Sequence, residues 1–182
     1  MNTLKLKKPE TMPKKTTSLV SSKLINLINY RIQQEELSSR LYLAMSLWLN
    51  DNGYFGAAKL WKKYSTEELV HADWARSFLL DLGLRPETQP LENVQNIFSS
   101  LPEIVRLSYD HEVLIYEQCT ELAKAALAEG NMLLYPLAIK YTGEQVEELG
   151  KLQNHLDRLS AFGTEPMLLR ELDEEMGELA EG

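Results

Sequence analysis

The chain has 182 residues, enough for one domain with a sizeable buried core. Hydrophobic residues make up 44% and charged residues 25%, values typical of a soluble globular protein, and no apolar run is long enough to span a bilayer. The net charge of −8 disfavours nucleic acid as a partner, because an acidic surface repels phosphates, so we expect neither a nucleic acid nor a membrane among the partners.

Residues 1–20 differ from the rest of the chain in charge. They contain five Lys and one Glu and have few apolar side chains to bury, which is typical of a flexible, basic N-terminal extension, with binding of an anionic partner as the alternative. The segment has no Arg, which disfavours an organelle transit peptide, and it lacks the apolar core of a signal peptide. The one cysteine, Cys119, excludes an intrachain disulfide and either fits a reducing compartment or is uninformative. Because the sequence shows neither a membrane span nor a signal peptide, we expect a cytoplasmic protein.

From Ser21 onward the sequence has helical periodicity and no convincing strand alternation. Turn residues and glycines divide it into four long helices and one short one. The predicted helices are Ser22–Leu49, Tyr54–Asp81, Leu101–Glu129, Met132–Ala161 and Pro166–Leu179. Residues 84–99, with two prolines, form a long connection. Pro136 requires that the fourth helix either begin near it or be kinked.

Two helical hairpins joined by one long crossover predict an all-α four-helix bundle over residues 21–163. Residues 164–182 then form a short C-terminal helix and tail. Because other bundles share this helix count, topology alone leaves the function open, and the interior polar residues narrow it.

Each long helix has an apolar stripe at three- and four-residue steps, with polar residues near its middle. Helices of about 28 to 30 residues that pack side by side bring their midpoints to one height. The sequence therefore predicts four carboxylates, one amide and one imidazole converging in an apolar core. These residues are Glu35, Glu68, His71, Glu112, Gln145 and Glu148.

Such a cluster requires cations, because burying one ionised carboxylate costs several kcal/mol. Apart from Arg31, placed about two turns away, the stripes supply no Lys or Arg near the midpoint. Carboxylate oxygens with an imidazole nitrogen suit iron or manganese and, less selectively, zinc. Glu68 and His71 lie one helical turn apart, where both can reach one metal. The four matched positions together indicate a metal site.

Residues 19–179 resemble a non-haem bacterial ferritin, whose fold is the ferritin-like four-helix bundle with a long crossover between the second and third helices. The supporting segments are QEELSSRLYLAMSLW, STEELVHADWARSF, DHEVLIYEQCTELAKAA and YTGEQVEELGKL. In that family, the di-iron ferroxidase centre takes a glutamate from the first helix, Glu-x-x-His from the second, a glutamate from the third and Gln-x-x-Glu from the fourth. The resemblance implies that Glu35 and His71 bind the first iron, Glu68 bridges, and Glu112 holds the second.

The resemblance also implies roles next to the iron pair. Gln145 lies on the oxygen-binding side, and Glu148 matches a residue at the second and third iron positions. Tyr42 matches a tyrosine that can supply an electron, with a hydrogen-bonded core tyrosine as the alternative. A third iron position is implied at three glutamates that step toward the edge of the bundle, for which a solvated acidic face is the alternative. They are Glu67, Glu144 and Glu147.

Other relatives fit less well. Bacterioferritins have Glu-x-x-His in the fourth helix, where this chain has Gln145 and Glu148, and bind haem through a methionine where this chain has Leu69. No haem is therefore expected. Rubrerythrins need paired Cys-x-x-Cys motifs, which a chain with one cysteine cannot supply. His111 and His155 fall off the midpoint cluster and are interpreted as hydrogen-bonded surface or interface groups, and the three Trp as packing residues.

The resemblance implies a ferroxidase and iron-storage subunit. Its substrates are Fe(II) and O2, its product is an Fe(III) oxyhydroxide mineral, and its assembly is a homo-oligomeric cage of about twenty-four subunits. Two alternatives are an oxidase or oxygenase that acts on an organic substrate at a di-iron centre, and a structural cage subunit with an inactive centre.

Overall fold

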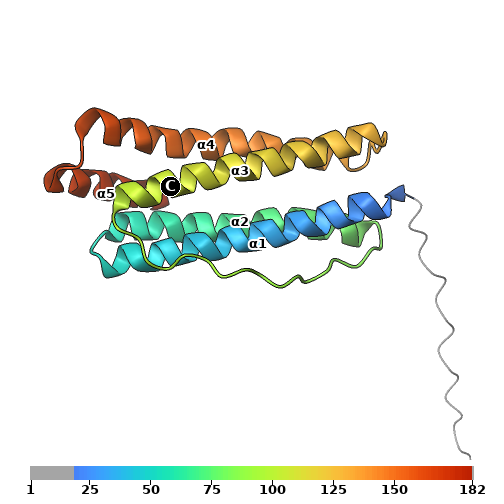
Figure 1. Cartoon of the computed structure of the whole chain (residues 1–182), viewed down its shortest axis with the longest axis horizontal. Helices are drawn as coiled ribbons and strands as arrows, with labels where there is room; N and C mark the ends of the chain where they lie inside the picture. Colours follow the sequence, from blue (N-terminus) through green and yellow to red (C-terminus); the bar gives the residue numbers. More distant parts are fainter. Residues whose placement is uncertain (1–18, 182) are drawn as a thin grey trace, which may run out of the picture.

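The computed structural model describes residues 19–181 as a bundle of five helices (Figure 1). The helices are α1 (Ser22–Asp51), α2 (Phe55–Asp81), α3 (Leu101–Ala128), α4 (Tyr135–Phe162) and α5 (Pro166–Glu181). This described part contains no strand, which confirms the predicted all-α bundle. Residues 1–18 of the predicted basic extension lie outside the described residues.

Two antiparallel hairpins, α1–α2 and α3–α4, lie side by side, and the connection between α2 and α3 runs back along α1 (Figure 1). Two hydrogen bonds hold this connection in place. The Gln33 amide donates to the Pro90 carbonyl at 2.7 Å, and the Glu87 backbone N–H donates to Oδ1 of Asn29 at 2.9 Å. The long connection between α2 and α3 therefore packs against the bundle along α1.

Side-chain caps explain where several helices begin. The Ser21 hydroxyl accepts from the Leu24 N–H, and Ser100 accepts from Glu103, each at 3.2 Å. The fourth helix begins at Tyr135, three residues later than predicted, because Asn131 accepts from the Leu134 N–H and holds the preceding turn. Pro136 consequently lies in the first turn, where its missing N–H costs nothing.

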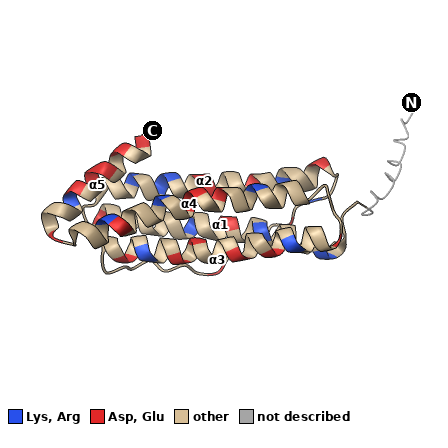
Figure 2. Ribbon diagram, turned by 90° about the horizontal axis from the view of Figure 1, so that it is seen from above, with Lys and Arg blue, Asp and Glu red and all other residues tan. Residues whose placement is uncertain are grey.

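Helix α5 folds back onto the start of α2 and lies obliquely at one end of the bundle, with acidic residues along it (Figure 2). Asp173 accepts a hydrogen bond from the Ala57 N–H at 2.7 Å, which satisfies a free donor in the first turn of α2. The backbones meet at two glycines. A Cβ on Gly56 would lie 1.8 Å from the Asp173 carbonyl oxygen, and one on Gly177 would lie 3.2 Å from the Gly56 Cα.

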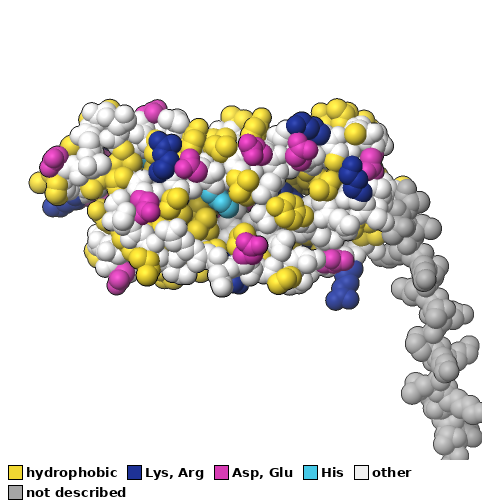
Figure 3. All heavy atoms as spheres, viewed as in Figure 1, with side chains coloured by type: hydrophobic (Ala, Val, Ile, Leu, Met, Phe, Trp, Pro, Cys, Tyr) yellow, Lys and Arg dark blue, Asp and Glu magenta, His cyan; other side chains and the backbone are white. Residues whose placement is uncertain are grey.

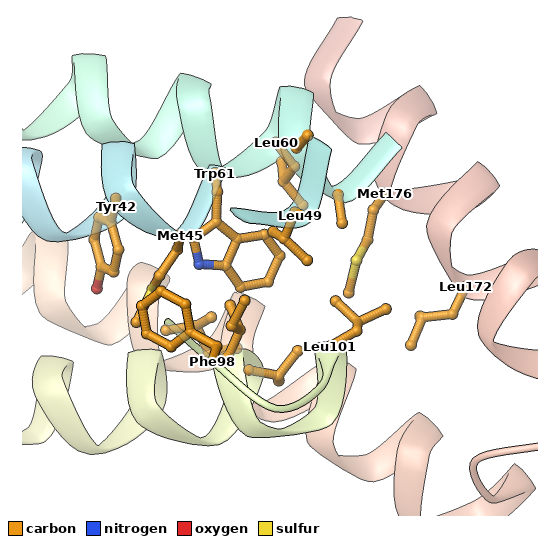
Figure 4. Packing of buried hydrophobic residues seen from close by; sticks show 14 residues of the cluster. Tyr42, Met45, Leu49, Leu60, Trp61, Phe98, Leu101, Leu172 and Met176 are labelled. Carbon is orange, nitrogen blue, oxygen red and sulfur yellow. The ribbon is translucent and has the colours of Figure 1, made fainter. Parts of the chain in front are cut away.

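Two apolar clusters fill the bundle. One, near α5, contains Met45, Leu49 and Trp61 together with Leu172 and Met176 of α5 (Figure 4). The other lies toward the opposite end, where α1 and α2 pack against the C-terminal half of α3 and the start of α4. The candidate metal-site residues fall between the two clusters in sequence on every long helix, so the polar layer is enclosed by apolar ones.

The face formed by α1, α3 and the connection carries acidic, basic and apolar side chains interspersed (Figure 3). None of the helices described has an apolar stretch of the length and composition needed to cross a membrane.

Candidate metal centre

The six predicted side chains converge in the interior from four helices. Each residue retains 9% or less of its accessible surface. Helix α1 supplies Glu35, α2 supplies Glu68 and His71, and α3 supplies Glu112, while Gln145 and Glu148 come from α4. The matched midpoints of the helices place these groups at one height.

Three groups of side chains have ligand atoms that all lie within 4.8 Å of one another. The first contains Glu35, Glu68 and His71, and the second contains Glu68, Glu112 and Glu148. Glu68 belongs to both groups, so two adjacent sets of potential metal ligands share this residue. The third group joins His71 and Glu148 to Glu144.

Hydrogen bonds from neighbouring residues fix the orientation of the candidate ligands. The Tyr42 hydroxyl donates to Oε1 of Glu112, and the Gln145 amide donates to Oε2 of Glu148 at 2.6 Å. The Tyr141 hydroxyl donates to the backbone carbonyl of His71 at 2.5 Å. Tyr42 is itself buried, so the alternative of a core tyrosine with a hydrogen-bonded hydroxyl describes its geometry.

Several buried oxygens of the cluster accept no hydrogen bond from the residues described. They are Oε2 of Glu35, Oε2 of Glu112 and Oε1 of Gln145. A buried acceptor without a donor costs about 1–3 kcal/mol, more when it is charged. Three such oxygens from three helices therefore form a donor set that fits a hard or borderline cation.

Burial and mutual repulsion shift the protonation of the cluster. Burial, followed by the charges of Glu112 and Glu35, raises the pKa of Glu68 well above its usual range. Burial raises the pKa of Glu112 to about 7 and that of Glu148 to about 10, whereas burial lowers the pKa of His71. Without metal the carboxyls retain protons that a bound cation would displace, so metal binding should release protons.

Arg31 is closer to the cluster than expected from the sequence. It lies one turn before Glu35 on α1, not two, and its Nε lies 2.8 Å from Oε1 of Glu35. Both side chains are 2% exposed. The i,i+4 spacing of the two residues could have revealed this ion pair, because it places them on one face of the helix.

The three glutamates of the implied third iron position do not all reach the cluster. Oε1 of Glu144 lies 3.8 Å from Nε2 of His71. Glu147 is exposed, and Glu67 lines a cleft of about 220 Å³ with His155. Within residues 19–181, neither Glu67 nor Glu147 belongs to a group of potential ligands as tight as those above.

His155 is the clearest difference between the predicted and observed positions of the polar residues. Predicted as a surface or interface group, it is 5% exposed and packs against Trp61, with ring centroids 6.5 Å apart. His111 is half-buried and shares a 2.8 Å hydrogen bond with Ser38. Burial lowers the pKa of each imidazole to about 4, so both are neutral packing groups at neutral pH.

The space inside the cluster is small. A cavity of about 10 Å³, room for roughly one water-sized sphere, lies among Glu68, Glu112 and Glu148. A much larger hollow, about 590 Å³, is an open groove between α1 and α3 that touches Arg31 but none of the six candidate ligands. The centre itself therefore accommodates ions and not a bulky organic molecule.

Residues 25–162 match the family model described as a ferritin-like domain. The chain belongs to the ferritin family. This match includes all six side chains of the centre and all four long helices, apart from the first three residues of α1.

Relatives in the ferritin family are similar over most of their length. The chain is 30% identical to a bacterial non-heme ferritin of Escherichia coli over 161 residues, which is 88% of this chain and 98% of the relative. It is 28% identical over 162 residues to a probable bacterial non-heme ferritin-like protein of Haemophilus influenzae, covering 89% of this chain and 98% of the relative. These relatives confirm the resemblance stated from the sequence.

Solved ferritin structures superimpose on the bundle. An open pore ferritin from the hyperthermophilic archaeon Archaeoglobus fulgidus matches with a TM-score of 0.84 and 27% identity, covering 87% of this chain and 98% of that one. A closed form engineered from the same ferritin matches equally well, with a TM-score of 0.84. The agreement confirms the ferritin-like fold.

Proposed function

We propose that this protein is a ferroxidase and iron-storage subunit, which oxidises Fe(II) with O2 at the buried centre. The observation that carries the proposal is the set of buried, unpaired oxygens that converge from different helices beside an imidazole. In this proposal, the two adjacent groups that share Glu68 hold two iron ions a few ångströms apart.

In this proposal each side chain of the centre has its own role in binding Fe(II). Glu35 and His71 hold the first iron, Glu112 holds the second, and Glu68 bridges them. Carboxylate oxygens are hard ligands that favour Fe(III) over Fe(II), so they assist the loss of one electron from each ion to O2. Tyr42 orients Glu112 through its hydrogen bond. In this proposal Tyr42 also supplies a further electron.

Gln145 and Glu148 complete the site on the side of α4, where Gln145 faces the oxygen-binding side. The product then moves toward a third position at Glu144, Glu67 and Glu147, of which Glu144 is the one nearest His71. Fe(III) finally leaves for an oxyhydroxide mineral inside a cage of subunits. The protons released by iron binding and hydrolysis pass to the solvent of that cage.

The two alternatives receive less support. An oxidase or oxygenase with an organic substrate needs a pocket next to the metals, but the cavity among the carboxylates is only about 10 Å³. A structural subunit with an inactive centre should lack ligands, whereas the five carboxylate and imidazole positions fall in tight groups of potential ligands, and the amide of Gln145 contacts one of them, Glu148.

Stopped-flow measurement of Fe(II) oxidation tests the proposal. The double variant Glu68→Ala with His71→Ala should lose fast oxidation while it retains helical content and assembly, because the changes remove groups that are unfavourable to bury without metal. Glu117→Ala, which removes an exposed carboxylate from α3, should retain the wild-type rate. Fast oxidation in the double variant would show that iron reacts elsewhere.

A further inference from the structure

Arg31 is a permanently charged group inside the metal centre. Its side chain is 2% exposed and reaches from α1 to α3, where Nη1 donates to Oε1 of Gln118 at 3.0 Å and to Sγ of Cys119 at 3.6 Å. Guanidinium groups stay protonated at any physiological pH. The centre therefore contains a permanent positive charge, the Arg31 guanidinium, in addition to the candidate metal ligands.

In the ion pair of Arg31 and Glu35, one carboxylate oxygen of Glu35 faces the guanidinium and the other is free to bind a metal. Oε1 lies 2.8 Å from Nε of Arg31, although the N–H is not aligned for a hydrogen bond, so the contact is chiefly electrostatic. Oε2 is buried and accepts no hydrogen bond from the described residues. This arrangement leaves Glu35 one oxygen, and not two, for a metal.

Arg31 also opposes the accumulation of positive charge at the centre. Oxidation of each Fe(II) to Fe(III) adds one positive charge, and a guanidinium on the other side of a ligand carboxylate repels every added charge in a medium where screening is weak. Lys151 also lines the small cavity, but it is exposed, so water screens its charge. Of these two cations, Arg31 therefore has the stronger effect on the bound ions.

We propose that Arg31 is a positioning residue that restricts Glu35 to single-oxygen binding and so weakens the hold of the centre on the oxidised iron pair. The proposal rests on the proposed function and adds a property to it: Fe(III) is released after each turnover instead of remaining as a fixed cofactor. Arg31 contacts the ligand and not the iron, so it acts through Glu35.

Co(II) binding tests this role without any redox chemistry. Arg31→Gln removes the charge and should increase the affinity for Co(II), measured by calorimetry, roughly tenfold. Arg31→Lys retains the charge and should stay closer to wild type. Arg40→Gln removes an equal charge from an exposed position on the same helix and should leave the affinity unchanged. The visible absorption of bound Co(II) should weaken in Arg31→Gln, because chelation by both Glu35 oxygens raises the coordination number.

Iron release is followed in the same variants by successive additions of Fe(II) in air. Wild-type protein should regain fast oxidation after each addition, whereas Arg31→Gln should oxidise the first pair rapidly and regain the fast phase several-fold more slowly. Arg31→Gln with wild-type Co(II) affinity and wild-type recovery would overturn the proposal.

A crystal structure of wild-type protein with Co(II) decides the matter even when Arg31→Gln does not fold. The proposal expects one Glu35 oxygen on the metal and the other still beside Arg31. Glu35 binding the metal through both oxygens, with Arg31 displaced, would overturn it. Wild-type protein that neither binds Co(II) at Glu35 nor oxidises Fe(II) would instead refute the proposed function, and the role of Arg31 with it.

Discussion

The Tyr42 hydroxyl on α1 donates a hydrogen bond to Oε1 of Glu112 on α3, and the two side chains are buried together. Burial raises the pKa of Glu112 to about 7, and the bond from Tyr42 opposes this rise because it stabilises the ionised carboxylate. The tyrosine therefore keeps one candidate iron ligand available for metal near neutral pH.

Tyr42→Phe should make Fe(II) oxidation more sensitive to acid. Loss of a hydrogen bond to a charged group costs about 1.5–3 kcal/mol, equivalent to a rise of about one to two units in the Glu112 pKa. Protons then compete better with Fe(II), so the rate should fall several-fold at pH 6.5 and less at pH 8. Tyr64→Phe, which removes a hydroxyl lining the same cavity, is the control. A rate that falls equally at both pH values would indicate that Tyr42 acts as an electron donor instead.

The metal-free protein should lose stability as the pH rises from about 7 to 9. Glu148 has a folded-state pKa of about 10, far above its unfolded value, so over this range the folded chain keeps a proton that the unfolded chain has lost. Each such group lowers the free energy of unfolding by on the order of 1 kcal/mol per pH unit. The two neutral histidines, His111 and His155, affect the free energy of unfolding only below about pH 6.5. There the unfolded chain binds protons that the folded chain does not, so falling pH destabilises the fold.

Thermal unfolding in the presence of a chelator measures this dependence. Glu148→Gln should flatten the decline above pH 7, and Co(II) should stabilise the wild-type protein more at pH 9 than at pH 7, because releasing the protons that the metal displaces costs less free energy at higher pH. A melting temperature that is constant or rises across this range in metal-free protein would contradict the buried, protonated state of the carboxyls.

Gly56→Ala should loosen α5 from the bundle. The added methyl group would meet the Asp173 carbonyl oxygen at 1.8 Å, so the helices must separate, at a cost of about 1–3 kcal/mol. Gly150→Ala, in open space on α4, should be neutral or stabilise by up to about 1 kcal/mol. Thermal unfolding and limited proteolysis after Gly163 measure the two effects. Equal behaviour of the two variants would show that the contact between α2 and α5 yields easily.

Deletion of residues 1–18 should leave assembly and Fe(II) oxidation nearly unchanged. Extending the deletion through Val20 should destabilise the bundle by about 1–3 kcal/mol, because Val20 is 2% exposed and the Leu19 carbonyl accepts from Asn131 at 2.9 Å. Size-exclusion chromatography and melting temperatures compare the two deletions. Loss of assembly on removing residues 1–18 alone would show that this segment makes a structural contact.

The long helices and the convergence of polar residues were predictable because both follow from periodicity within single helices. His155 was predictable too, since it lies seven residues after Glu148 and three after Leu152, on the same stripe of α4. A polar residue type favours a surface position, so the burial of His155 was not predicted. In the structure its neutral ring packs on Trp61. The start of the fourth helix depended on one bond from Asn131, which propensity does not reveal.

The docking of α5 was not predictable from local pattern. Its apolar face requires a partner, but the sequence does not state which surface provides it. In the structure α5 packs against the start of α2. Gly56 of α2 and Gly177 of α5 allow the two backbones to approach, and Asp173 of α5 accepts from a free N–H of α2. Such a choice depends on residues more than a hundred positions apart and becomes visible only in three dimensions.

The crossover along α1 has a consequence for the order of folding. It divides the centre evenly, since Glu35, Glu68 and His71 belong to the first hairpin and the other three groups to the second. Each hairpin can form from local contacts alone, which is fast, while their association must bring carboxylates of like charge face to face. The last step of folding should then be the slowest at alkaline pH, and a divalent cation that bridges the two hairpins should accelerate it.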